Sequence, residues 1–144
     1  MSSSAVRAAI LAEVSNLASP WPVYNASDYN EFEDIMNSIE AEAVVVQFIA
    51  SDDQMQSVGA EVNQCWEETG SAVLHMLVPT GFDSVPVVDK GERIQTGLRG
   101  SRLANDVLIE SCSPFTDFGG STAGVNGAVH GWTANAFYSR RSHG

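Results

Sequence analysis

Two cysteines and two histidines are the residues best suited to nucleophilic chemistry in this sequence. A thiolate is a strong nucleophile, and an imidazole within reach can act as the general base that activates it. Cys65 or Cys112 with His75 or His130 would form such a pair. None of the four lies in a recognisable nucleophile motif, and a lone histidine on a strand is more often structural than catalytic. A small cytosolic thiol enzyme is therefore the less favoured hypothesis.

Other motifs with chemical meaning are incomplete. The glycine-rich stretch Gly119 to Gly127 lacks the lysine of a phosphate-binding loop. The two cysteines do not have the spacing of a zinc site. The segment Asp28 to Glu42 holds six acidic residues and no basic one, but it does not contain the ligand pattern of a calcium-binding loop. The sequence therefore predicts no catalytic residue, no cofactor and no metal site.

Charge and composition narrow the classes of partner. With 7 Lys and Arg against 18 Asp and Glu, the formal net charge is -11, which repels phosphate backbones and argues against sequence-specific nucleic-acid binding. The same repulsion would suit a channel through which DNA passes without adhering. No apolar run approaches the roughly 18 residues of a membrane span, and no signal peptide is evident. We expect two reduced thiols and a protein made inside a cell.

A chain of 144 residues with 44% hydrophobic residues fits one domain, residues 1–144. Apolar residues at helical spacing predict a helix over Ala5 to Ala18, with a serine before it as N-cap. Ala43 to Ala50 is β-branched and apolar on both faces, which predicts a buried strand. In the segment Asp28 to Glu42, apolar residues keep helical spacing, so both a short helix and a solvated insertion stay open.

The stretch from Val62 to Pro79 predicts one long strand. From Ala72 onward, alternate residues are apolar on one side and mixed on the other, so both faces need a cover. We expect the hairpin turn before it at Gly59, with Gly70 as a bulge or a close approach of another backbone. One end of this strand would lie in the domain core, and the other could reach a neighbouring subunit. His75 would then be a sheet or interface residue.

The second half of the sequence predicts one helix and two further strands. The apolar spacing over the segment Asp83 to Leu103 predicts an amphipathic helix, with Gly100 as its C-terminal stop. Gly91 and Gly97 would allow this helix to approach a sheet closely. Strands follow over Asp106 to Ser113 and over Ala128 to Ser139, separated by the glycine-rich loop; the chain then ends in a basic tail with Arg140, Arg141 and His143. The predicted fold class is α+β, with an antiparallel sheet of about four strands packed against the two main helices.

The order of these elements resembles the tail terminator proteins of long-tailed bacteriophages and related gene transfer agents. The matching residues lie in four places, which are Pro22 to Asn25, Thr69 to Gly81, Leu98 to Gly100, and Trp132 to Tyr138. Together they cover nearly the whole chain in order of elements. The acidic segment Asp28 to Glu42 is longer than the usual connection in that family.

The resemblance implies a structural virion protein without catalytic residues. Members of the family form a hexameric ring on the head-proximal end of the tail tube, stop its growth and join it to the neck proteins. The expected partners are therefore five further copies, the tail tube protein, the neck protein and DNA passing through the lumen, with assembly in the bacterial cytoplasm and no membrane. Another neck or tail protein, such as a head-closure (stopper) or tail-tube protein, is the alternative.

Within such a ring, opposite charges would set the register between neighbours. The candidate contact residues for subunits or partners are Asp52, Asp53, Arg93, Arg99, Arg140 and Arg141.

Overall fold

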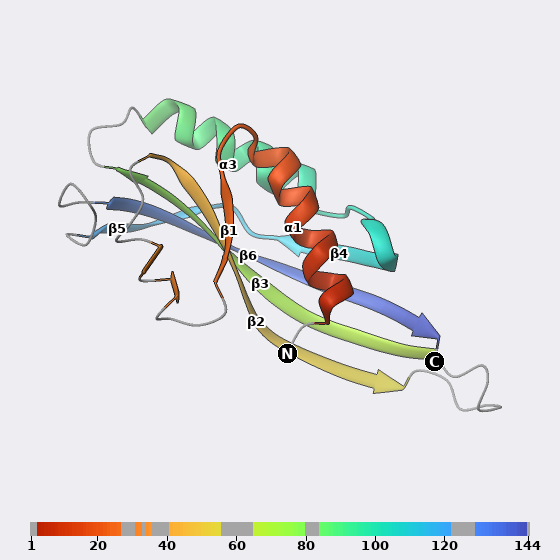
Figure 1. Cartoon of the computed structure of the whole chain (residues 1–144). Coiled ribbons are helices and arrows are strands. Elements are labelled where there is room, and N and C mark those ends of the chain that lie inside the picture. Colours follow the sequence, from red (N-terminus) through yellow and green to blue (C-terminus); the bar gives the residue numbers. More distant parts are fainter. Residues whose placement is uncertain are drawn as a thin grey trace.

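The chain folds as a layer of two helices against one face of a six-stranded sheet (Figure 1). This computed structural model describes residues 3–26, 31–32, 34–35, 41–55, 65–79, 84–121 and 129–143. Its elements are α1 (Ser4–Ala18), β1 (Val23–Ala26), β2 (Ala43–Met55), β3 (Cys65–Pro79), α3 (Ser84–Leu98), the 3-10 turn η2 (Ala104–Asp106), β4 (Val107–Cys112), β5 (Thr116–Ser121) and β6 (Val129–His143). The predicted α+β class is confirmed.

The sheet differs from the predicted one in two respects. Its order is β1-β2-β3-β6-β4, with β5 also paired to β6, so the described sheet has six strands instead of about four. β1 runs parallel to β2, which makes the sheet mixed. Two parallel neighbours need a connection long enough to return the chain to the starting end, usually a dozen residues or more. The acidic segment between Ala26 and Ala43 is that crossover.

The two longest ladders join β3 to its neighbours. β3 pairs with β6 without interruption from Cys65 opposite His143 to Pro79 opposite Val129. The long strand predicted through Gly70 is therefore confirmed over Cys65–Pro79, and of the two alternatives for Gly70, a bulge or a close backbone approach, the bulge is not there. The irregularity lies in β2 between Phe48 and Ala50, where β2 has one extra residue. The turn expected at Gly59 is outside the described residues.

The C-terminal part of the chain needs further corrections. The predicted glycine-rich loop begins later than expected, because β5 extends to Ser121; residues 122–128 are outside the described part. The predicted basic tail is the last part of β6, which continues to His143. Arg140 and Arg141 therefore occupy defined positions in the sheet opposite Glu68 and Glu67.

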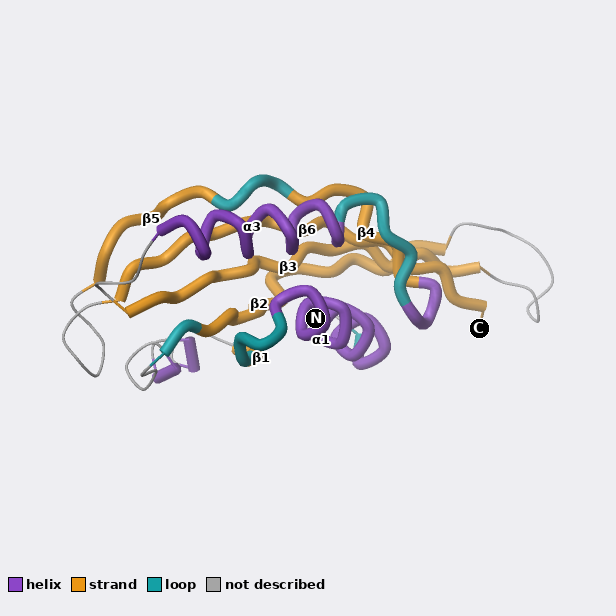
Figure 2. Tube along the Cα trace, turned by 90° about the horizontal axis from the view of Figure 1, so that it is seen from above, coloured by secondary structure: helices purple, strands orange, loops and turns teal. Residues whose placement is uncertain are grey.

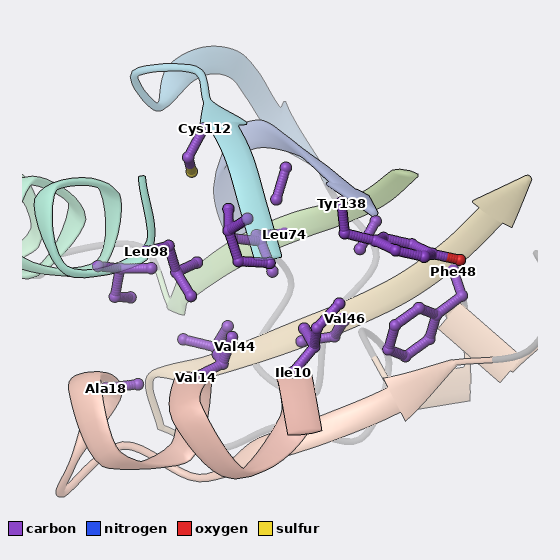
Figure 3. Packing of buried hydrophobic residues seen from close by; sticks show 14 of the residues in the cluster. Ile10, Val14, Ala18, Val44, Val46, Phe48, Leu74, Leu98, Cys112 and Tyr138 are labelled. Atoms are coloured by element: carbon purple, nitrogen blue, oxygen red, sulfur yellow. The ribbon is translucent and has the colours of Figure 1, made fainter. Parts of the chain in front are cut away.

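Both helices bury apolar residues against the same face of the sheet, which we call the helix face. In α1 the predicted positions Val6, Ile10 and Val14 are buried at helical spacing, whereas Leu17, predicted with them, is half-buried and Ala18 is fully buried in its place. Figure 3 shows α1 packed against Val44, Val46 and Phe48 of β2, with Leu74 and Tyr138 from the next two strands. Burial of this face is the main source of stability in the fold.

Two glycines of α3 allow close packing, although in different directions. A Cβ atom on Gly91 would lie 2.9 Å from the terminal methyl carbon of Met76, so this glycine brings α3 close to the sheet, as predicted. A Cβ on Gly97 would lie 2.5 Å from a Leu17 methyl carbon, so this glycine admits α1 instead. α3 ends at Leu98, and Gly100 two residues later has a φ of +71°. This left-handed conformation after a helix end favours glycine, because glycine has no Cβ atom to clash.

The opposite face of the sheet, which we call the crossover face, is covered over only part of its length. Phe32 and Ile35, both helical in the crossover, pack with Ala26, Val45 and Leu77 there. The interpretation of this segment as a wholly solvated insertion is therefore wrong for these two side chains. The rows nearer the other end of β3 have partly or fully exposed side chains, including Thr69, Ser71, Asn135 and Phe137.

A buried carboxylate fastens α1 to the sheet. Glu68 is 8% exposed, and its Oε2 accepts hydrogen bonds from the backbone N–H of Ser3 at 3.1 Å and the hydroxyl of Tyr138 at 3.2 Å. Ser3 is the N-cap of α1 and accepts from the N–H of Val6 through its own hydroxyl. In a capping box the helix supplies the glutamate itself. Here α1 has no acidic residue in its first turn, and β3 supplies the glutamate.

Replacement of this carboxylate tests its role. We expect Glu68→Ala to lower the free energy of unfolding by about 1–3 kcal/mol, because the buried Tyr138 hydroxyl and the Ser3 N–H lose an acceptor. Urea denaturation measures the change. Glu67→Ala is the matched control, since this neighbour points to the other face and forms an exposed ion pair worth less than about 1 kcal/mol. Equal effects of the two substitutions would contradict the assignment.

Candidate functional site

The thiol and imidazole groups considered for nucleophilic chemistry do not come together. Cys112 lies in the cluster on the helix face, whereas His75 packs beside Phe32 on the crossover face, with ring centroids 4.5 Å apart. Cys112 pairs with Ala136, six residues along β6 from His130, which corresponds to about 20 Å. The sheet therefore separates Cys112 from one histidine and strand length separates it from the other.

Cys65 is also distant from both histidines. It begins β3, where its backbone pairs with His143; its side chain is outside the described part. His75 is ten residues further along the same extended strand, or about 33 Å away. His130 pairs with Val78, still nearer the opposite end of β3. None of the four predicted thiol–histidine pairs is formed by this arrangement.

Cys112 has the environment of a structural thiol. It is 6% exposed, and its sulfur donates to the Ser113 carbonyl at 3.7 Å. Burial raises the pKa of the Cys112 thiol to about 11, because the interior disfavours the charged form. The reactive thiolate is thus scarce at neutral pH.

His75 links three strands across the crossover face. Its Nε2 lies 3.4 Å from Gln47 Oε1 in β2, and its Nδ1 lies 3.2 Å from Thr133 Oγ1 in β6. The amide oxygen can only accept, so Nε2–H donates to Gln47. In the neutral ring, Nδ1 then accepts from the Thr133 hydroxyl. Burial lowers the pKa of His75 to about 4, which agrees with that state and with the predicted role in the sheet.

The six candidate contact residues fall into two groups. Asp53, Glu68 and Arg140 occupy one cross-strand row, and Asp52 lies in the next row through its pairing with Thr69. Only the backbone of the two aspartates is described. Arg93 and Arg99 lie at exposed positions on α3 and immediately after it. The structure therefore brings Asp52, Asp53, Arg140 and Arg141 to one end of the sheet and places the other two in the helix layer.

The arginines at this end of the sheet make limited contacts within the subunit. Arg140 Nε donates to the Asn105 carbonyl at 2.9 Å. Arg141 Nε lies 3.4 Å from Glu67 Oε2, but the Arg141 side chain remains 71% exposed. Arg141 also lines a shallow polar depression of about 430 Å³ on the crossover face, formed by Glu67, Arg102, Asp106, Leu108, Glu110, Ser139 and Arg141. These charges of both signs are available to a partner surface.

Of the two cationic side chains of α3, Lys90 and Arg93, Lys90 makes contacts within the subunit. Lys90 donates to the Ser19 carbonyl at 2.8 Å, and its ammonium group lies 5.6 Å from the centre of the Trp21 ring. Desolvation, and then repulsion from Arg93, lower the pKa of Lys90. Lys90 thus joins α3 to the segment after α1, while Arg93 is exposed beside it.

Exposed apolar side chains mark the same end of the sheet. Ile49, at the irregularity of β2, is 55% exposed, and Phe137, on the crossover face of β6, is 50% exposed. The row of Phe137 runs through Ser71 to Ala50, next to Ile49 in the chain. We call this end of the three strands, residues 48–55, 65–73 and 135–143, the strand arm. Figure 1 shows the three strands continuing side by side towards this end.

An apolar groove of about 260 Å³ lies elsewhere, between α3 and the segment that leads to β5. Met76, Val88, Phe115 and Trp132 contribute to its lining, with Glu92 and Gln95 at α3. Val88 is 51% exposed there. The sequence analysis did not identify this groove, since its walls come from elements far apart in the chain.

Sequence reasoning also missed Glu68 and the packing of Phe32. Glu68 is an even number of residues from Ala72, Leu74 and Met76 in the same strand, so its side chain lies on the same face of the sheet as theirs. This alternation could have predicted from the sequence that the Glu68 carboxylate faces the helices. The position of Phe32 depends on the path of the crossover, for which periodicity alone carries no information.

Among the described residues, no cluster of three or more His, Cys, Asp or Glu side chains is arranged to hold a metal ion. No helix in the described part is long and apolar enough to span a membrane.

Comparison with known proteins identifies the fold and no family. No protein-family model and no curated protein matches the sequence. A solved structure of a protein without a descriptive name has the same fold, with a TM-score of 0.61 and 14% sequence identity, over 100% of this chain and 99% of the other. At this level of identity the likeness concerns the fold alone.

Neutral His75 makes a testable contribution to stability. Because its pKa is about 4 in the fold and 6.5 in an unperturbed histidine, the unfolded chain binds the proton first as the pH falls. The contribution is present above about pH 6.5 and is lost towards pH 4. We expect His75→Gln to reduce the difference in unfolding free energy between pH 7.5 and 4.5 by on the order of 2 kcal/mol in urea denaturation. A His75 ring that titrates near pH 6.5 by NMR would contradict this.

The environment of Cys112 predicts slow thiol chemistry. In a Cys65→Ser variant, which isolates Cys112, iodoacetamide at pH 8 should label the folded protein at least about 100-fold more slowly than the urea-unfolded chain, because the folded thiol is buried and its pKa is raised. Mass spectrometry measures the rates. Equal labelling of folded and unfolded protein would show an accessible thiolate.

Proposed function

We propose that this chain is a ring-forming tail terminator, a structural subunit that caps the head-proximal end of a phage-like tail tube and joins it to the neck. The observation that carries the proposal is the strand arm. It projects an open sheet face, exposed Ile49 and Phe137, and charged groups at one end of a well-packed domain. Exposed apolar residues surrounded by polar ones are typical of surfaces that bind other proteins.

The positions of the segments that carry the family resemblance support the same proposal. Pro22 to Asn25 leads into and forms most of β1, Thr69 to Pro79 lies in β3, and Trp132 to Tyr138 lies in β6. Leu98 ends α3 immediately before Arg99 and Gly100. Three of the four segments therefore lie mainly in strands, as far as they are described, and the fourth marks the end of α3. A family of assembly subunits would keep its common features in this framework.

The chemistry of the described part supports a role without catalysis. The four predicted thiol–histidine pairs, with His75 and His130, are far apart, Cys112 is buried, and His75 is engaged by Gln47 and Thr133. The net charge of -11 is compatible with a ring whose lumen lets DNA pass without adhesion. The proposed partners are five further copies, the tail tube protein and a neck protein, and the proposed location is the neck end of a virion tail.

Deletion of the coding sequence from a particle-producing host tests the function. We expect electron micrographs to show tails of uncontrolled length without heads, because nothing ends the growth of the tube. Restoring the wild-type chain should restore normal tails. A Cys65→Ser, Cys112→Ser chain should do so equally well, which separates the structural role from a thiol enzyme.

Other phenotypes would assign other roles. Tails of normal length without heads would favour a head-closure protein, and absence of tubes would favour a tail-tube protein. Normal particles after deletion, or failure of the double cysteine variant to complement while remaining folded, would contradict the proposal.

A further inference from the structure

The sheet has two edges without a strand partner among the described residues, and they lie on opposite sides. β1 covers the outer edge of β2 only over Val44 to Gln47, so the part from Phe48 to Met55 pairs with β3 alone. On the other side, β5 pairs only with β6. Figure 2 shows β4 and β5 following one another along the side opposite β1. An open edge of this length is a ready template for another strand.

The outer edge of β4 is not available in the same way. The segment after α3 runs beside it, where Leu103 N–H donates to the Val107 carbonyl at 2.7 Å, Gly100 N–H to the Ile109 carbonyl at 2.8 Å, and Ile109 N–H to the Ser101 carbonyl at 2.9 Å. These bonds satisfy the outward groups of β4. Among the described residues, the open edges are therefore the outer edge of the short strand β1, the distal half of β2 and β5.

The hydrogen-bond pattern shows which groups of β2 point outward. Val44 N–H donates to the Pro22 carbonyl at 2.9 Å on the β1 side, so alternation directs Phe48 outward too. The extra residue between Phe48 and Ala50 shifts the alternation by one. The backbone N–H and C=O groups of Ser51, Asp53 and Met55 therefore point away from β3, towards the open side.

We propose that this open edge of β2 (Phe48–Met55) pairs with β5 (Thr116–Ser121) of a second copy of the chain. Each subunit then uses its β2 edge to bind one neighbour and its β5 edge to bind the other neighbour. Such a head-to-tail contact generates a ring when the rotation that relates successive subunits returns to the first one. The two segments have similar lengths, and exposed Ile49 would be covered in the contact. Main-chain bonds of this kind are an established mode of strand addition.

Charge favours this pairing over a two-fold one. If β2 paired with β2 of a second copy along the open edge, Asp52 and Asp53 of one chain would lie beside the same residues of the other. Like charges on facing strands are destabilising. β5 contains a single acidic residue, Asp117, so pairing with β5 brings fewer like charges together.

The two edges are also offset along the strands in a way that suits closure. The open part of β2 lies opposite Trp66 to Ala72 of β3, whereas β5 lies beside Val129 to Thr133 at the other end of β6. Neighbours joined through these offset edges would have strands inclined to the axis of the ring. Closing a sheet around an axis requires strands tilted from that axis, by roughly 35–45° in barrels.

This inference identifies the subunit contact of the ring and in that respect rests on the proposed function. Its test is Asp53→Pro against Asp53→Asn. Both remove the charge, but only proline removes the outward N–H, and an outward position on an edge strand tolerates proline. In native mass measurements over a concentration series, Asp53→Asn should associate like the wild type, whereas Asp53→Pro should need about two- to thirteen-fold more protein, which is the range that corresponds to the net value of one lost backbone hydrogen bond.

A cross-linking experiment identifies the partner edge even if the proline variant folds poorly. Asp53→Cys and Thr116→Cys are introduced in separate chains, each of which also carries Cys65→Ser. Each chain is oxidised alone and in a mixture with the other. In a second series Ser121→Cys replaces Thr116→Cys, because the register between β2 and β5 of the second copy decides which end of β5 lies near Asp53. Covalent dimers only in a mixture support the pairing. Dimers of Asp53→Cys alone indicate the two-fold contact and overturn it, as does the absence of dimers in both mixtures. A wild-type chain that stays monomeric throughout also overturns it.

The deletion phenotype distinguishes failure of this inference from failure of the proposed function. If deletion gives uncontrolled tails and a folded Asp53→Pro chain restores normal ones, the chain is a terminator and the edge contact is wrong. If deletion leaves tails normal while Asp53→Pro abolishes self-association, the edge contact stands and the terminator role does not.

Discussion

The pairing of β3 with β6 is the interaction on which the rest of the structure depends. It runs without a break over the full length of both strands, and every other strand pairs with one of these two or with β2 beside them. Because side chains alternate along such a ladder, its register decides what each face of the sheet carries. A slip of β3 by one residue would move Leu74 away from the helices and bring His75 into its place.

The two faces are covered by different means, and the difference explains where the strand arm lies. α1 and α3 share the helix face, and Gly97 allows them to pack closely where Leu17 meets α3. On the crossover face, the described cover consists of Phe32 and Ile35, which reach only the end of the sheet near Leu77. The parallel entry of β1 makes this crossover necessary. An antiparallel sheet can leave the rest of one face polar and open, as it is around Thr69 and Asn135.

The buried carboxylate of Glu68 connects this open end to the helix layer. It lies in β3 beside Glu67, whose side chain takes the opposite face, and it reaches both the start of α1 and Tyr138 of β6. Gly70 stands directly opposite Tyr138 and adds no side chain on that face, which fits a ring that leans towards Glu68. The strand arm is therefore held by a specific polar contact as well as by the ladder, and its geometry is defined before any partner binds.

The sequence by itself determined the elements with strong local signals. The period of α1, the β-branched start of β2, the alternation of β3 and the glycine after α3 each specify a local conformation, and the α+β class follows from their order. The tertiary structure alone decided the parallel pairing of β1, the bulge in β2, the place of β5 and the separation of the two thiols from His75 and His130. These features depend on which segments distant in the chain become neighbours, and local periodicity does not encode that choice.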